Sequence, residues 1–258
     1  MLDIFDILGP IMIGPSSSHT AGAVRIGRMA RTLLGEKPVK ADIGLYGSFA
    51  ETGKGHGTDR ALVAGLLGMR PDDLRIPESF TVAAEEGLTF TIHPVELREA
   101  HPNTAVLTVE GISGKKTCVQ AVSIGGGRIR VDKLDGVAVN FTGAFNTLIV
   151  RHMDVPGELA TLTREISNAD INIANMSLVR DRRGGSVMTI FEIDQPVPAA
   201  ELDEAQALCY LRRQEVAAGA FSEGVNLVCA RGRALGFAKR IGNRVNNMYP
   251  NTLRIIKR

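Results

Sequence analysis

The sequence predicts an α/β protein with two folding units, and three observations lead to this prediction. Helical and strand patterns alternate through residues 1–143, which is typical of a mixed α/β domain. Residues 147–208 follow the order strand, helix, strand, strand, helix, and one more strand would complete a ferredoxin-like βαββαβ unit. Residues 209–258 form a basic tail with ten Lys or Arg against two Asp or Glu, whereas the rest holds twenty against twenty-six.

The composition sets limits on the class of protein. Hydrophobic residues make up 44% and charged residues 22% of the 258 residues, which are ordinary values for a globular protein. The net charge of +2 indicates no particular partner, and we expect neither nucleic-acid nor membrane binding. No apolar run approaches the ~18 residues of a membrane-spanning helix. The segment from Met1 to Asp6 is acidic where a secretion signal would be basic, so we expect a cytoplasmic protein.

Three cysteines, Cys118, Cys209 and Cys229, occur without Cys-x-x-Cys spacing. So few cysteines in a chain of this size make disulfide stapling improbable. A metal or iron–sulfur cluster needs several thiolates brought together. We therefore expect no metal ligands in this chain.

The N-terminal domain begins with a polar loop, Gly14–Thr20, whose Ser or Thr side chains can cap the following helix, Ala21–Leu34. A strand over Lys40–Phe49 leads to a second glycine-rich loop, Gly53–Asp59, and to the helix Arg60–Leu67. Further strands are predicted at 88–93, 105–110, 117–124 and 128–131. Gly125–Gly127 predicts a tight turn between the last two, because glycine accepts positive φ at little cost.

The second unit begins near Asn146. Its elements are predicted from strand and helix periodicity and from turn residues. They are the strand Thr147–His152, the turn Asp154–Gly157, the helix Glu158–Ser167, the strands Ile171–Arg180 and Ser186–Asp194, and the helix Ala199–Leu208.

Two interpretations of the tail, residues 209–258, stay open. Val225–Ala230 can serve as the last strand of the βαββαβ unit, with Arg212–Gly224 as an inserted segment. Alternatively, the reading frame is altered near residue 208. Basic residues interspersed with aromatics also fit nucleic-acid contact. A solvated extension of uncertain order is the expected state.

The first polar loop places Ser16, Ser17, Ser18, His19 and Thr20 directly before a helix. Hydroxyls, an imidazole and the unpaired N–H groups of a helix start can together hold a carboxylate or a phosphate. The alternative is an ordinary helix cap with spare serines.

The second loop carries Lys54 and His56 between glycines. It lacks the complete phosphate-loop pattern, so nucleotide binding is not indicated. Because no bulky neighbour covers His56, this histidine is a candidate general base. A structural or solvated histidine is the alternative. His101-Pro102-Asn103-Thr104 is either a binding loop or a turn between strands.

Several of these segments together resemble the beta chain of iron–sulfur L-serine dehydratases. They are Gly14–Ala23, Thr52–Asp59, His101–Thr104 and Ser123–Gly127. Residues 147–208 resemble an ACT domain, a small-molecule sensing βαββαβ module that follows in the same family. The resemblance implies an L-serine ammonia-lyase of amino-acid catabolism that is active only as a two-chain complex. It further implies a [4Fe–4S] cluster held by cysteines of a partner alpha chain, no pyridoxal phosphate, and pairing of copies through their ACT domains.

The resemblance also implies residue roles. One cluster iron would act as a Lewis acid on the serine hydroxyl while a base removes the α-proton, and the enamine product would become pyruvate and ammonium. The catalytic residues would be His56, the α-proton base, and His19. Substrate would be held by Ser16, Ser17, Ser18, Thr20 and Lys54. L-serine as an effector would bind at His101 and Asn103, and the ligand-facing edge of the ACT domain would include Asp154, Pro156, Gly157 and Asn172.

Two other functions compete with a lyase subunit. One is a stand-alone amino-acid-binding regulator of the ACT type. The other is the regulatory end of an amino-acid dehydrogenase, which the lack of a Gly-x-Gly-x-x-Gly fingerprint after a strand disfavours. The two glycine-rich, histidine-bearing loops favour the lyase subunit, because a pure sensor has no need of them.

Overall fold

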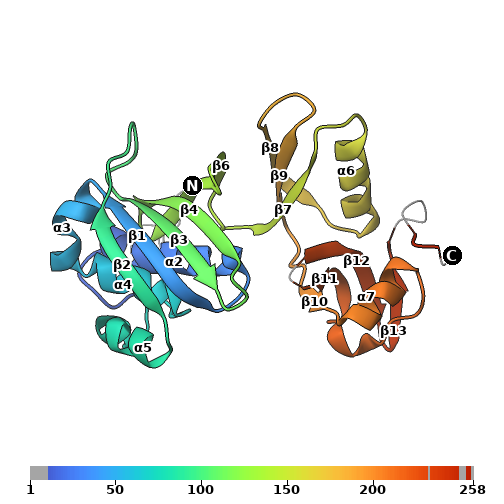
Figure 1. Cartoon of the computed structure of the whole chain (residues 1–258), viewed down its shortest axis with the longest axis horizontal. Coiled ribbons are helices and arrows are strands. Elements are labelled where there is room, and N and C mark those ends of the chain that lie inside the picture. Colours follow the sequence, from blue (N-terminus) through green and yellow to red (C-terminus); the bar gives the residue numbers. More distant parts are fainter. Residues whose placement is uncertain (1–10, 232, 250–253, 257–258) are drawn as a thin grey trace. The chain divides into compact units, whose positions relative to one another are not determined.

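The structure is a computed structural model that describes residues 11–231, 233–249 and 254–256, apart from the side chains of Lys54 and Arg233. The chain divides into two compact units, Met1–Ala144 and Phe145–Arg258, drawn in blue to green and in yellow to red in Figure 1. The acidic N-terminal segment, on which the expectation about secretion rests, lies outside the described residues. No described helix is both long and apolar enough to cross a membrane.

Unit 1 contains a six-stranded sheet with the strand order β2-β1-β3-β4-β5-β6. β1 and β2 run parallel, and the other neighbouring pairs are antiparallel. The strands are β1 (Pro38–Tyr46), β2 (Thr89–Pro94), β3 (Thr104–Gly111), β4 (Lys116–Gly125), β5 (Arg128–Leu134) and β6 (Val137–Phe141). The predicted mixed α/β class is confirmed, and β6 is a strand that the sequence did not predict.

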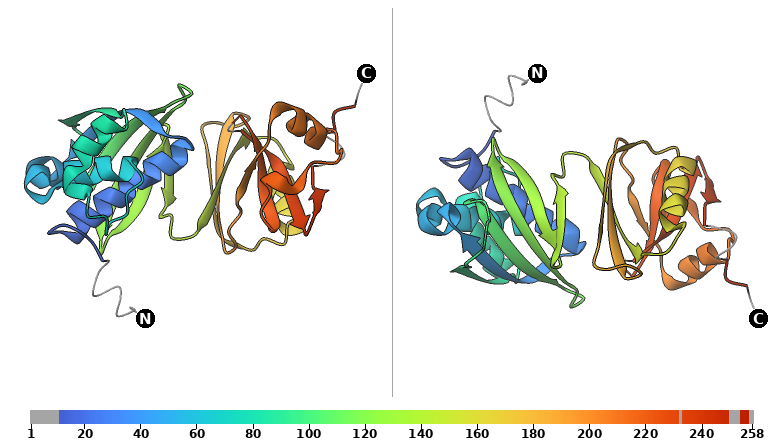
Figure 2. Two further views of the ribbon diagram at one scale, coloured as in Figure 1. Left: turned by 90° about the horizontal axis from the view of Figure 1, so that it is seen from below. Right: turned by 90° about the horizontal axis from the view of Figure 1, so that it is seen from above.

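Helices lie on one face of this sheet (Figure 2). They are the π-helix η1 (Ser17–Gly22), α2 (Ala23–Leu34), α3 (Ser48–His56), α4 (Thr58–Leu66), the 3-10 turn η2 (Ile76–Glu78) and α5 (Ser79–Glu85). α2 and α4 pack closely because each presents a glycine to the other. A Cβ added at Gly27 would overlap the Leu62 carbonyl, and one at Gly65 would overlap that of Val24. This contact fixes the beginning of α2 and therefore η1 before it.

Two local predictions in unit 1 are wrong. The strand expected at Lys40–Phe49 ends at Tyr46, because Gly47 turns the chain with φ +55° into α3. The loop expected at Gly53–Asp59 is mostly the end of α3, and Gly57 alone, with φ +68°, breaks the chain before α4. The predicted tight turn is confirmed, since Gly125, Gly126 and Gly127 all have positive φ.

The first part of unit 2 is a three-stranded antiparallel sheet with the order β7-β9-β8. Its elements are β7 (Asn146–Met153), α6 (Glu158–Asn168), β8 (Ile173–Arg180) and β9 (Ser186–Ile193). α6 begins after Gly157, which has φ +88°. Ile166 of α6 packs in a buried cluster with Phe191 and Ile193 of β9. The predicted order strand, helix, strand, strand is confirmed.

The last part of unit 2 is a separate sheet with the order β10-β11-β12-β13. Its elements are β10 (Ala199–Glu201), α7 (Glu204–Leu211), the 3-10 turn η3 (Ala218–Ala220), β11 (Gly224–Ala230), β12 (Arg233–Ile241) and β13 (Arg244–Asn247). β11 pairs with β10 and β12, so the expectation that Val225–Ala230 completes the first sheet of unit 2 is wrong. The expected helix Ala199–Leu208 is also wrong in its first residues, which form β10.

The described part of the tail is therefore an ordered module with a core of its own. Tyr210 is fully buried and its hydroxyl donates to the Phe237 carbonyl over 2.9 Å. Val225 and Phe237 of this sheet, and Met248 directly after β13, also pack against the α6 and β9 cluster. The tail thus contributes apolar side chains to the cluster around α6 and β9.

Candidate active site

His19 lies on η1, the single turn of π-helix that leads into α2. Ser16 caps this turn, and its hydroxyl accepts the His19 backbone N–H over 3.2 Å. The prediction that a serine of the loop caps the helix is confirmed. Single π-helical turns occur often at functional sites. Here the turn buries the His19 side chain, which is 8% exposed.

Both ring nitrogens of His19 have hydroxyl partners. Nε2 lies 3.1 Å from Ser48 Oγ and 3.1 Å from Thr52 Oγ1, and both residues are on α3. The Thr52 hydroxyl donates to the Ser48 carbonyl over 2.8 Å, so it accepts from His19, and Nε2 carries the proton. Nδ1 then accepts from the Ser18 hydroxyl at 3.2 Å or from that of Ser16 at 3.4 Å.

Burial lowers the pKa of His19 below its usual value of 6.5, and the nearby His56 lowers it further, against an opposing hydrogen bond from Ser48. His19 is therefore neutral at neutral pH. With both nitrogens engaged and the ring buried, it is fixed in place and poorly placed to collect a proton from a substrate.

His56 ends α3 beside His19 and differs from it in exposure and in hydrogen bonding. The two rings meet edge to face with their centroids 4.8 Å apart. His56 is exposed, and its imidazole nitrogens have no hydrogen-bond partner among the described residues. Its backbone carbonyl accepts the Thr20 hydroxyl over 3.4 Å, which ties η1 to the end of α3. A histidine with free nitrogens beside a fixed, neutral one suits a general base.

The structure brings the two histidine-bearing motifs together. Their other residues differ in burial and in whether they contact His19. Ser16 and Ser18 bond to His19, and Thr20 is buried. Ser17 is half-buried with no side-chain partner among the described residues, which leaves its hydroxyl available to a ligand. The side chain of Lys54 lies outside the described part.

Sequence reasoning missed three residues of α3 that surround His19. They are Ser48 and Thr52, which bond to Nε2, and Phe49, whose ring lies 5.2 Å from that of His19. The expected strand through Phe49 and the expected loop from Gly53 together hid the helix α3 that carries them. Only the helical spacing of Ser48 and Thr52, four residues apart, marks them as neighbours.

The loop His101–Thr104 begins β3 and is held by its own hydrogen bonds. His101 Nδ1 accepts the Asn103 N–H over 3.1 Å, and the Thr104 hydroxyl donates to the His101 carbonyl over 2.6 Å. His101 is exposed and Asn103 is half-buried. The Asn103 side-chain amide has no hydrogen-bond partner among the described residues and can meet a ligand.

In unit 2 the structure separates the residues expected to share a ligand edge. Asp154 and Gly157 precede α6, where Asp154 accepts hydrogen bonds from the Gly184 N–H at 3.0 Å and from Arg180 at 3.1 Å. Asn172 follows α6 at its other end and donates to Asp194 over 2.6 Å. The eleven residues of α6 span ~16 Å, so Asp154 and Asn172 lie near opposite ends of this helix.

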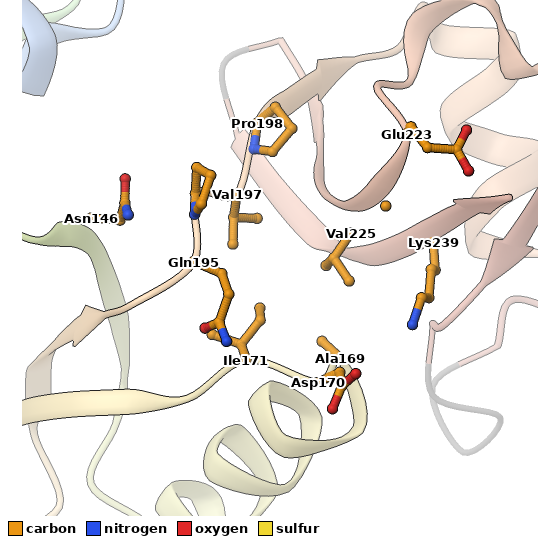
Figure 3. Close-up of a pocket in the computed structure, with 12 residues that line it drawn as sticks. Asn146, Ala169, Asp170, Ile171, Gln195, Val197, Pro198, Glu223, Val225 and Lys239 are labelled. Atoms are coloured by element: carbon orange, nitrogen blue, oxygen red, sulfur yellow. The ribbon is translucent and has the colours of Figure 1, made fainter.

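Unit 2 has a pocket of about 580 Å³ at the Asn172 end of α6 (Figure 3). Its apolar walls include Ile171, Val197 and Val225, while Lys239 and Gln195 extend toward its middle. Lys239 is half-buried and has no ion-pair partner among the described residues.

The described residues of this chain hold no group of three His, Cys, Asp or Glu side chains that could bind a metal ion. Cys118 and Cys209 are half-buried, and Cys229 is buried. Cys118 belongs to unit 1, whereas the other two belong to unit 2.

Three family models match this chain. The serine dehydratase beta chain model matches residues 1–86, the ACT domain model 146–210, and the methyltransferase RsmF PUA domain model 197–255. The fold and these matches define a class: an α/β chain that joins a serine dehydratase beta-chain domain to an ACT domain. The third match makes residues 197–255 similar to a PUA domain, and these residues include most of the tail. The expectation of a solvated extension of uncertain order is wrong for the described residues of the tail, which form β11, β12 and β13. The alternative of an altered reading frame near residue 208 stays an untested interpretation.

Individual relatives narrow this class. The chain is 40% identical over 205 residues to the probable L-serine dehydratase, beta chain, of Bacillus subtilis, covering 80% of this chain and 93% of the relative. It is 36% identical to the L-serine dehydratase, beta chain, of Peptoniphilus asaccharolyticus, covering 75% and 87%. L-serine dehydratase 2 of Escherichia coli is 44% identical over 30% of this chain and 18% of its own. The chain belongs to the family of L-serine dehydratase beta chains.

Proposed function

We propose that this chain is the beta subunit of an L-serine dehydratase, which converts L-serine to pyruvate and ammonia together with an alpha chain. The observation that carries the proposal is the pair of histidines, the buried His19 and the exposed His56, whose ring centroids lie 4.8 Å apart. Family membership supplies the substrate and the partner.

In this proposal His56 removes the α-proton of L-serine. The C–H electron pair forms the double bond of an enamine, the C–O bond breaks, and the hydroxyl leaves as water after taking up a proton. Hydrolysis of the enamine's imine tautomer gives pyruvate and ammonium. Because burial keeps His19 neutral, the proton gained by His56 does not face a second positive charge. Ser17 and Lys54 are proposed to hold the substrate carboxylate.

The cofactor belongs to the proposal as well. A [4Fe–4S] cluster bound by cysteines of the alpha chain would supply Lewis acidity toward the serine hydroxyl, without pyridoxal phosphate. The three scattered cysteines of this chain do not fit a cluster of their own. The exposed edge around His56 would then face the alpha chain.

Regulation is proposed to act through L-serine at His101 and Asn103, whose side chains keep free polar atoms. We further propose that copies of the subunit pair through their ACT domains and that the enzyme works in the cytoplasm. Asp154, Gly157 and Asn172 remain candidates for ligand contact, but at two separate ends of α6.

Co-expression with the alpha chain tests the proposal. The pair, prepared without oxygen and with iron, should show an iron–sulfur absorption band and form pyruvate from L-serine. Either chain alone should form none. An assembled pair with the cluster band but without pyruvate formation would contradict the proposal.

The second candidate function is a stand-alone amino-acid-binding regulator, and the observation that favours it is the pocket beside Lys239. Calorimetric titration of the full chain with L-serine separates the two. Binding that Lys239→Ala abolishes and His101→Ala leaves intact would favour the regulator. Binding lost only in His101→Ala would favour the effector loop of the dehydratase.

A further inference from the structure

The end of the π-helix that carries His19 rests directly on Ser123 of β4. A Cβ added at Gly22 would overlap the Ser123 hydroxyl and lie 2.8 Å from Ser123 Cβ, so only glycine fits this contact. Ser123 is fully buried, and its hydroxyl has no hydrogen-bond partner among the described residues. Buried polar groups without partners are rare enough to call for an explanation. Stabilisation by a hydrogen bond does not explain a serine here.

The backbone of Ser123 leads to the loop His101–Thr104. Its N–H donates to the Asn103 carbonyl over 3.0 Å. Asn103 is in turn bonded to the His101 ring through its own N–H. One chain of contacts therefore joins His101, Asn103 and Ser123 to Gly22 at the end of η1.

A second chain of contacts reaches the other side of His19. A Cβ added at Gly47 would lie 2.8 Å from Pro102 Cα, and the Phe49 N–H donates to the Pro102 carbonyl over 3.3 Å. Gly47 directly precedes α3, the helix whose Ser48 and Thr52 bond to His19 Nε2. The same loop thus touches both elements that hold the His19 ring.

We propose that the loop His101–Thr104 positions His19 through these two glycine contacts, and that Ser123 is the positioning residue on the η1 side. A close-packed interior transmits a displacement instead of absorbing it. A ligand that shifts the loop therefore moves η1 and α3 together and changes how His19 meets His56. The inference rests on the proposed function, in which L-serine binds at His101 and Asn103.

Nuclear magnetic resonance of the full chain labelled at its histidines tests this coupling without the cluster. Added L-serine should shift the ring signals of His101 and of His19 in the wild type. In Ser123→Gly, His101 should still shift while the His19 response is mostly lost. Gln120→Ala, on the same strand, should behave as the wild type does.

The outcomes are distinguishable. An undiminished His19 shift in Ser123→Gly would overturn the inference and leave the proposed function standing. The absence of any His101 shift in the wild type would overturn the effector assignment and the inference with it. The lyase proposal depends on neither result, because pyruvate formation by the two-chain enzyme tests it separately.

Enlarging the side chain at position 22 and then removing the one at position 123 gives an independent test in the two-chain enzyme. Gly22→Ala should lower kcat on the order of tenfold or more, because its methyl group displaces η1 from Ser123. The double variant Gly22→Ala with Ser123→Gly vacates that space and should regain most of the lost kcat. Cooperativity toward L-serine should fall in Ser123→Ala, whose milder change keeps the fold. Additive losses in the double variant, or unchanged cooperativity in Ser123→Ala, would contradict a positioning role.

Discussion

Two regions of the molecule have similar sequences but different structures. The segments around His19 and His56 in unit 1, like the loop before α6 in unit 2, combine glycines with polar side chains next to a helix end. In unit 2 the Asp154 carboxylate forms hydrogen bonds within its own turn, because it accepts from the Gly184 N–H and from Arg180. In unit 1 one histidine is fixed by internal hydrogen bonds, while its neighbour His56 keeps its ring nitrogens free of described partners.

This difference shows what separates a structural turn from a candidate site. A polar side chain that closes its own turn has little capacity left for a ligand. A binding site needs a side chain whose polar atoms are free to meet a ligand, beside side chains that are fixed by internal hydrogen bonds. His56 and His19 are arranged in this way. Substituting one side chain at a time in each region tests whether the two regions differ in this way.

His56→Ala should have the largest effect. In the two-chain enzyme it should lower kcat on the order of 10²-fold or more, because a positioned general base is lost. The cluster absorption should stay, since this residue is not proposed as a ligand. His93→Ala is the matched control, an exposed histidine of β2 paired with Asp42, and should keep near wild-type turnover. Turnover close to wild type in His56→Ala would remove its assigned role.

Phe237→Ala should have the next largest effect, on the stability of unit 2. Its ring is half-buried against the α6 and β9 cluster, so its loss should lower the free energy of unfolding by about 2 kcal/mol, below the cost at a fully buried site. Urea unfolding followed by circular dichroism measures this. Leu208→Ala, at a residue 38% exposed on α7, should change stability by about 0.5 kcal/mol or less. Equal effects would contradict the packing of Phe237 against the α6 and β9 cluster.

His19→Gln should change how stability depends on pH. The pKa of His19 is lowered in the folded chain, so below pH 6.5 the unfolded chain binds the extra proton and the folded chain resists it. Wild-type stability should therefore fall from pH 6.5 downward until the folded-state pKa is passed. Part of that fall should be absent in His19→Gln, as measured by the midpoint of thermal unfolding from pH 7 to pH 5. Parallel curves for both proteins would contradict a buried, neutral His19.

How far the sequence predicted these features depended on whether the responsible residues are local. Ser16 caps the turn containing His19, and Gly125–Gly127 turn the chain, as expected, because caps and turns depend on adjacent residues. The pairing of His19 with His56 came from the resemblance. The helix α3 was not predicted, because the three glycines Gly53, Gly55 and Gly57 indicate a loop by intrinsic preference. Packing against η1 and α4 instead selects a helix.

Non-local features escaped prediction for the same reason. Val225–Ala230 was correctly predicted as a strand, but its partners β10 and β12 could not be read from its own pattern. The close contact of Gly22 with Ser123 joins residues 101 positions apart in the sequence. In such cases the sequence contains a glycine, but only the fold shows which residue this glycine contacts.

Asp154→Asn should have the smallest effect and completes the comparison. The Gly184 N–H first, and then Arg180, hold the pKa of Asp154 below its usual 3.8, so its stabilising effect is present above that pH and lost as pH falls through the folded-state pKa. The variant should melt slightly earlier than the wild type at pH 7, by less than Phe237→Ala, and the difference should vanish in acid. Arg180→Met should not add its full effect to that of Asp154→Asn, because the two side chains share one hydrogen bond. The response of the two-chain enzyme to L-serine should not change. A changed response to L-serine with an unchanged melting temperature would make Asp154 a ligand contact. The loop before α6 would then be a binding site, as we propose for the residues around His56.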